Sequence, residues 1–195
     1  MITGDLIFTQ TGSATNAISA VTQGYKGARI NHVGILIETQ LGKFVLEAFP
    51  PEVRLTSIKV FINRSKDASG YPRFLAARLE QEHRGLISEA IAYGLKQRDI
   101  PYDRRYITDE AALYCSELIV DMFKFANNGI EFFKESPMSF RDFETGEVHE
   151  YWVRYYNYFG MDVPEGEPGS NPGDISRDSK LHIYDVVGEI TGYQP

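Results

Sequence analysis

Two short runs of alternating side chains, separated by a turn, constrain the fold of this chain more than any other feature. Val33, Ile35 and Ile37 occupy every second position of the first run, and residues 44–49 follow the turn at 39–42. A period of two is typical of β-strands, and two such runs around a short turn predict an antiparallel hairpin. We therefore expect an α+β fold, in which helices pack against the apolar face of an antiparallel sheet.

The register of this hairpin determines which polar side chains meet. If Glu38 pairs with Lys43, then Gly34 lies opposite Glu47, and His32 shares their face of the sheet. His32 and Glu47 are then diagonal neighbours, and the absence of a side chain at Gly34 leaves room between them. A slip of one residue would move Glu47 to the opposite face. The predicted register thus places a histidine and a glutamate together.

The rest of the chain predicts a single domain over residues 1–195, because this length suffices for one sizeable core. Periodicity and turn residues predict further elements along it. Strands are expected at 6–9, within 53–62, at 74–79 and at 181–187, and helices at 13–22 and 85–97. Residues 130–143 are expected to form an irregular packed segment, and residues 164–179 a Pro/Gly-rich excursion.

The only cysteine, Cys115, lies where another helix is expected to begin. Apolar residues, among them Phe125, recur at spacings of three and four as far as Ala126. Asp109 and Glu110 lie just upstream, where acidic residues favour a helix start. The positive end of the helix dipole favours a thiolate at this place, although a lone cysteine is also common as a small core residue.

Cys115, His32 and Glu47 fit the three roles of a thiol hydrolase: nucleophile, base, and the residue that orients the base. Each residue also has an ordinary structural interpretation, as a buried thiol, an edge histidine or a solvated carboxylate. The combination predicts acyl transfer through a thioester. Asp5 is expected to hold a turn and not to be catalytic.

Composition restricts the partners that this chain can have. A formal net charge of -7 argues against nucleic-acid binding, and no apolar run reaches the length of a transmembrane segment. The other histidines, His83, His149 and His182, lack metal-ligand spacing, so we expect no metal and no cofactor. No signal peptide is recognisable, so the compartment is extracytoplasmic if a leader was removed and cytoplasmic otherwise. The oligomeric state is not predicted.

Four motifs occur in an order that resembles a known family. They are Gly4-Asp5-Leu6-Ile7-Phe8, Asn31-His32-Val33-Gly34-Ile35, Leu46-Glu47-Ala48 and Tyr114-Cys115-Ser116-Glu117-Leu118. The set is similar to the circularly permuted branch of the NlpC-type cysteine peptidases, the YiiX/YebB-like proteins, in which the histidine and the acid precede the cysteine. The resemblance covers about residues 1–124. It implies a papain-like half-barrel of antiparallel strands packed against the cysteine-bearing helix.

The resemblance also implies candidates around the nucleophile. Ordinary NlpC-type members carry Pro-Tyr shortly before an Asp-Cys-Ser-Gly motif, and Pro101-Tyr102 matches that pair. The tyrosine is therefore a candidate oxyanion donor or substrate contact, and a packed loop tyrosine is the alternative. Tyr114 and Ser116 are further candidates. Tyr114 and Glu117 depart from the Asp and the Gly of the ordinary motif, so the resemblance does not fix the substrate details of the cell-wall peptidases for this chain.

Three classes of function remain open. The first, which we expect, is a cysteine hydrolase that cleaves an amide in a peptide or a cell-wall-type peptide. The second is a lipid ester or amide hydrolase or an acyltransferase, because the resemblance extends to lecithin:retinol acyltransferase-like proteins of the same permuted order. The aromatic run 152–159 is compatible with an acyl site, but equally with a core. The third is a non-catalytic binding module, against which the intact Cys, His and Glu argue.

Overall fold

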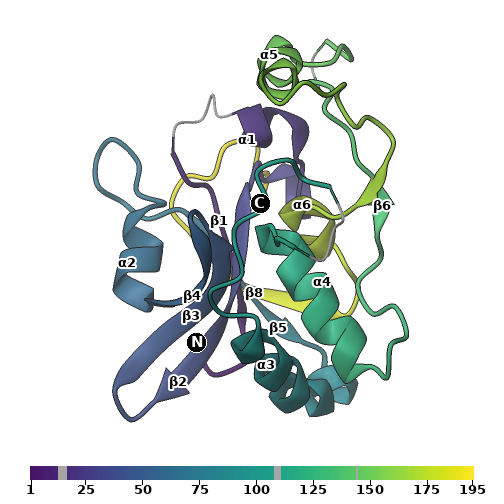
Figure 1. Cartoon of the computed structure of the whole chain (residues 1–195). Helices are drawn as coiled ribbons and strands as arrows, with labels where there is room; N and C mark the ends of the chain where they lie inside the picture. The colour runs from purple at the N-terminus through teal and green to yellow at the C-terminus, as the bar shows by residue number, and fades with distance from the viewer. Residues whose placement is uncertain (13–16, 108–110, 144) are drawn as a thin grey trace.

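An antiparallel sheet forms the centre of the molecule (Figure 1). The computed structural model describes residues 1–195 except 13–16, 108–110 and 144. Six strands pair in the order β4-β3-β2-β1-β5-β8, and every pair is antiparallel. The strands are β1 (Leu6–Thr9), β2 (His32–Thr39), β3 (Gly42–Phe49), β4 (Glu52–Ser57), β5 (Phe74–Leu79) and β8 (Leu181–Val187). The predicted antiparallel sheet is thus confirmed.

Helices cover both faces of this sheet (Figure 1). Helices α3 (Ile87–Lys96) and α4 (Cys115–Ala126) pack together on one face, and α2 (Ile58–Asn63) lies on the other, against β3 and β4. The remaining short elements lie around the edges of these layers. They are α1 (Ala17–Val21), η1 (Tyr25–Gly27), η2 (Gln81–Leu86), α5 (Glu150–Tyr158), α6 (Pro172–Ser176) and the pair β6 (Ser136–Pro137) and β7 (Pro168–Gly169).

The larger core lies between the sheet and helix α4. Val33 and Ile35 are fully buried there, as the alternation predicted, and Phe123 joins them from the helix. Complete burial of such a side chain contributes about 1.5–3 kcal/mol. Phe125, which we expected on the buried stripe, is 45% exposed and stacks on Tyr93 of α3. The reason is the helical period, which turns position 125 to the rim of the stripe and position 123 into the core.

The second face of the hairpin is also buried, by an element that the sequence did not predict. Leu36 and Val45 are fully buried on this face against Phe61 of α2. The run 58–62, which we expected to be strand, is helical because Ser57 caps it: its Oγ accepts a hydrogen bond of 3.4 Å from the Val60 N–H. The face that holds His32 is therefore covered by α2.

The other predicted elements agree with the structure in part. The strands at 74–79 and 181–187 have the predicted bounds, whereas the helix predicted at 85–97 begins at 87 after a 3-10 turn. Residues 130–143 contain only the short β6, and residues 164–179 contain β7 and α6. The start of the helix predicted at 13–22, and Asp109 and Glu110, lie outside the described residues. Among the described residues, no helix is long and apolar enough to cross a membrane.

Asp5 holds the amino-terminal turn and joins three strands. Its carboxylate accepts hydrogen bonds from the Ile2 N–H at 2.7 Å, from Nε of Arg78 at 2.7 Å and from the Tyr184 hydroxyl at 2.7 Å. Burial works against the ionised carboxyl, but these donors outweigh it and hold the pKa of Asp5 below its usual value. Asp5 therefore ties β1 to β5 and β8, in keeping with the structural role expected for it.

Candidate active site

The β2–β3 hairpin has the register that the sequence predicts. Glu38 pairs with Lys43, and a Cβ atom built at Gly34 would lie 3.3 Å from the Cβ of Glu47. Gly34 and Glu47 therefore share one face. The open position between the strands lets His32 reach across, and its Nε2 lies 2.5 Å from Oε2 of Glu47.

Glu47 is fully buried and surrounded by donors. Oε1 accepts a hydrogen bond from the Thr56 hydroxyl at 2.5 Å, and Nη2 of Arg64 reaches Oε1 at 2.5 Å and Oε2 at 2.7 Å. Burial alone would raise the pKa of Glu47, but the contacts with His32 and Arg64 outweigh burial and lower it to about 2. Glu47 is thus an ionised acceptor at any neutral pH.

His32 lies between this carboxylate and the thiol of Cys115. Its side chain is almost completely buried, and the rings of Phe49 and Phe61 contact it at centroid distances of 5.3 and 5.4 Å. Burial disfavours the charged ring, but hydrogen bonds and charge interactions with Cys115 and Glu47 outweigh it and raise the pKa of His32 to about 9. Since Nε2 faces Glu47, Nδ1 is the ring nitrogen left for the thiol.

Cys115 is the first residue of α4 and is buried to 6% exposure. Tyr114 precedes it in an extended conformation, and Oε2 of Glu117 accepts a hydrogen bond of 3.2 Å from the Tyr114 N–H, which caps the helix. The N–H groups in the first turn of a helix have no acceptor within the helix. The thiol therefore lies where a negative charge, on sulfur or on a substrate oxygen, is favoured.

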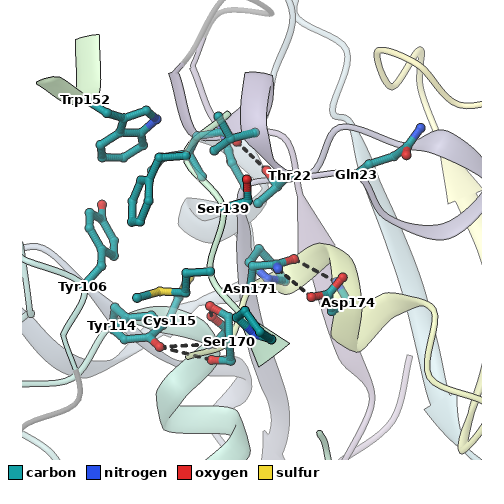
Figure 2. A pocket seen from close by; sticks show the side chains of 18 of the residues that line it. Thr22, Gln23, Tyr106, Tyr114, Cys115, Ser139, Trp152, Ser170, Asn171 and Asp174 are labelled. Carbon is teal, nitrogen blue, oxygen red and sulfur yellow. Dashed lines mark hydrogen bonds between the residues drawn. The ribbon is translucent and has the colours of Figure 1, made fainter. Parts of the chain in front are cut away.

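Tyr114 and Ser116 both bind Ser170, on the segment between β7 and α6. Figure 2 shows Tyr114 beside Ser170. The Tyr114 hydroxyl accepts a hydrogen bond of 3.0 Å from the Ser170 N–H, and the Ser116 hydroxyl donates one of 3.1 Å to the Ser170 carbonyl. These two candidate residues therefore attach the late segment 168–174 to the start of the cysteine helix. The sequence did not predict this attachment.

Tyr102, the third candidate, lines the same cavity as Cys115. Its hydroxyl pairs with that of Tyr106, and burial, together with the charges of Tyr106 and Cys115, raises its pKa well above the usual value. Tyr102 therefore keeps its proton, and its hydroxyl remains a hydrogen-bond donor in the cavity that Cys115 lines.

A cavity of about 200 Å³ opens beside Cys115. Figure 2 shows Tyr106 and Trp152 on one side of it and Asn171 and Asp174 on the other. Its apolar wall includes Ile18, Val21, Met138, Phe140, Phe143 and Trp152. The indole Nε1 of Trp152 is buried and has no hydrogen-bond partner among the described residues. The cavity can hold a largely apolar group beside the thiol.

Two partners of Glu47 were not found from the sequence. Thr56 faces Glu47 from β4, across the β3–β4 pairing, whose register the sequence left open. Arg64 directly follows α2, the segment that we expected to be a strand. Ser57, which caps α2, is the one local signal for that helix. This signal does not specify that the side chain of Arg64 reaches Glu47.

No cluster of three or more His, Cys, Asp or Glu side chains in the described part of the chain could hold a metal ion. The side chains that meet at the site are a thiol, an imidazole, a carboxylate and an arginine. Such a set can form a thiolate, attack a carbonyl carbon and transfer a proton to a leaving group.

Comparisons with known proteins identify the family and the fold of this chain. The model of the family described as permuted papain-like amidase enzyme, YaeF/YiiX, C92 family, matches residues 1–183. The crystal structure described as metalloprotein yiiX from Escherichia coli O157:H7 superposes with a TM-score of 0.73 at 20% identity, over 94% of this chain and 96% of that chain. This likeness shows a shared fold. No curated protein matches the sequence.

Proposed function

Because this chain belongs to the permuted papain-like amidases, which are thiol hydrolases, we propose that it cleaves an amide through a Cys115-His32-Glu47 triad. The substrate is a peptide or a cell-wall-type peptide, and the intermediate is a thioester. One observation carries this proposal: His32 is buried between Glu47, at 2.5 Å from Nε2, and Cys115. A histidine in this position can hold the thiol as an ion pair.

The reaction begins with transfer of the thiol proton of Cys115 to His32. The thiolate attacks the carbonyl carbon of the amide, and the carbonyl oxygen becomes an oxyanion. The backbone N–H of Cys115, at the start of α4, and the Tyr102 hydroxyl are the donors that we assign to this oxyanion. His32 then protonates the leaving amine, and the carbon–nitrogen bond breaks to leave a thioester.

Hydrolysis of the thioester uses the same residues in reverse. His32, now neutral, takes a proton from water, and the hydroxide attacks the thioester carbon. The carbon–sulfur bond breaks, a carboxylic acid leaves, and Cys115 and His32 return to their ion pair. Glu47 keeps the ring orientation in both halves, because its carboxylate accepts the hydrogen bond from Nε2.

A specific observation also favours the second class, hydrolysis or transfer of a lipid acyl group. The wall of the cavity beside Cys115 includes the apolar side chains of Ile18, Val21, Met138, Phe140, Phe143 and Trp152. An apolar wall next to a nucleophile suits an acyl chain as well as it suits an apolar amino-acid side chain. The chemistry at the thiol is the same in both classes, so only the substrate differs.

Acylation by p-nitrophenyl acetate tests the shared chemistry. We expect a burst of p-nitrophenolate stoichiometric with protein, and mass spectrometry should find one acetyl group on Cys115. Cys115→Ala should lack the burst, and His32→Ala should slow it strongly. If a normally folded wild-type protein shows no acetylation of Cys115, the proposal is wrong and a binding module is favoured.

A paired substrate panel separates the two enzyme classes. One arm contains murein peptides, and the other contains short-chain thioesters and phospholipids. Turnover confined to the peptide arm supports an amidase, whereas turnover confined to the lipid arm identifies a lipid hydrolase or acyltransferase. Cys115→Ala is the control in both arms.

A further inference from the structure

Glu47 has more hydrogen-bond donors around it than the third member of a triad requires. The carboxylate is completely buried, and an ionised group in such a place is costly unless other groups balance its charge. Three side chains donate to it: His32 from β2, Thr56 from β4, and Arg64 from the end of α2. Two of these donors carry positive charge, but only Arg64 keeps its charge throughout the reaction.

The charge on His32 changes at each step of the proposed mechanism. The ring is positive while it holds the thiol proton, and neutral once it has protonated the leaving amine. At that stage Arg64 supplies the one remaining positive charge that contacts Glu47 among the described residues. Without it, a buried carboxylate beside a neutral ring would tend to take up a proton and stop accepting from Nε2.

The guanidinium of Arg64 is held by the same rings that contact His32. It lies 3.9 Å from the ring centroid of Phe49 and 5.4 Å from that of Phe61. Its Nη2 reaches both oxygens of Glu47, whereas its Nε is buried and has no partner among the described residues. The rings therefore fix the plane of the cation, and the contact with both oxygens fixes the carboxylate.

A second arginine on the same face shows that this placement is specific. Arg54 is paired directly with Glu47 across β3 and β4. Its Nη2 nevertheless donates to the Pro50 carbonyl at 3.1 Å, and its guanidinium lies 5.6 Å from the Phe49 centroid. Proximity along the sheet therefore does not make an arginine a partner of Glu47, and Arg54 provides a matched control.

We propose that Arg64 is a positioning residue that keeps Glu47 ionised and oriented whatever the charge on His32. This inference rests on the proposed triad. It adds Arg64 as a fourth residue behind Cys115, His32 and Glu47. Thr56 has a smaller role, because its hydroxyl is a neutral donor to Oε1 of Glu47. Arg64 touches neither substrate nor thiol in this role, and it acts through the carboxylate alone.

The test follows the side-chain carboxyl of Glu47 by ¹³C NMR in protein labelled at glutamate, with the resonance assigned from Glu47→Gln. In wild type, the carboxyl should stay ionised down to about pH 3, because an adjacent cation lowers a carboxyl pKa by roughly 1–3 units. Arg64→Met should raise the titration midpoint by roughly 1–3 pH units. Arg54→Met should leave it at the wild-type value. Amide spectra at each pH show that the protein is folded.

Arg64→Lys provides the second variant. A lysine keeps the charge, but it contacts one oxygen and cannot stack as a plane, so the midpoint should rise less than in Arg64→Met. Acetylation of Cys115 by p-nitrophenyl acetate should nevertheless be slower than in wild type for both Arg64 variants. An unchanged midpoint in Arg64→Met, an equal shift in Arg54→Met, or wild-type acetylation in Arg64→Lys would each overturn the inference.

Failure of the proposed function has a different result. If wild-type Cys115 is not acetylated at all, the triad is wrong whatever the carboxyl titration shows. If Cys115 is acetylated and His32→Ala slows the reaction, but Arg64→Met leaves the Glu47 midpoint unchanged, the triad stands and the role of Arg64 is refuted.

Discussion

Replacing Glu47 with glutamine should lower the pKa of His32 from its wild-type value of about 9. The carboxylate lies 2.5 Å from Nε2 and stabilises the imidazolium, and it would be replaced by a neutral amide of similar shape. A contacting opposite charge is worth roughly 1–3 pKa units, so the pKa of His32 should fall to about 6–8. Each unit corresponds to about 1.4 kcal/mol of preference for the charged ring.

The assay is an NMR titration of protein labelled at the histidine ring. The chain has four histidines, and His32→Ala identifies the resonance to follow. Glu38→Gln is the matched control, because Glu38 lies on the same hairpin but is half exposed and pairs with Lys43 at 3.7 Å. It should leave the His32 midpoint unchanged. If the midpoint is the same in wild type and Glu47→Gln, the carboxylate does not support the ring, and the account of the site fails.

Three further predictions concern the thiol, the carboxylate and the attachment of the late segment. Iodoacetamide should alkylate Cys115 rapidly below pH 8, and His32→Ala should shift the pH profile upward, since an unassisted thiol titrates near pH 8.5; coincident profiles would exclude the ion pair. Because the pKa of Glu47 is lowered to about 2, its contribution to the unfolding free energy is complete above about pH 4.5 and is lost as the pH falls towards 2. Urea unfolding should show this loss in wild type and lack it in Glu47→Gln, and equal pH dependence in both would refute it. Tyr114→Phe removes the acceptor of a buried loop amide and should cost about 1–3 kcal/mol in urea unfolding. Tyr158→Phe, at a side chain that is 86% exposed, should cost nothing measurable, and equal costs would show that the buried contact is unimportant.

The hairpin could be predicted from its alternating side chains and its short turn, and the turn at 39–42 suggested the pairing of Glu38 with Lys43. Alternation with a period of two fixes which face each residue occupies, so pairing Glu38 with Lys43 also brings His32 and Glu47 together. The start of the cysteine helix was likewise predictable, because the apolar stripe from Cys115 to Ala126 repeats at helical spacing.

Helix α2 and the partner that it delivers could not be predicted in this way. The run 58–62 is short and apolar, and such runs fit a strand or a buried helix equally well, so tertiary packing decides between them. The position of Arg64 over Glu47 depends on that choice and on the β3–β4 register. The attachment of Ser170 to Tyr114 joins positions 56 residues apart, and no local pattern encodes such a contact.

The attachment at Ser170 has a consequence for the order in which the chain is made. His32 and Cys115 leave the ribosome well before the segment that binds Tyr114 and Ser116, and β8, which pairs with β5, follows later still. Domains begin to organise from the amino terminus during synthesis. A growing chain can therefore bring its histidine and cysteine together while the wall of the cavity formed by 170–174 is still missing. The binding pocket is complete only after residues 170–174 have been synthesised and have docked on the start of the cysteine helix.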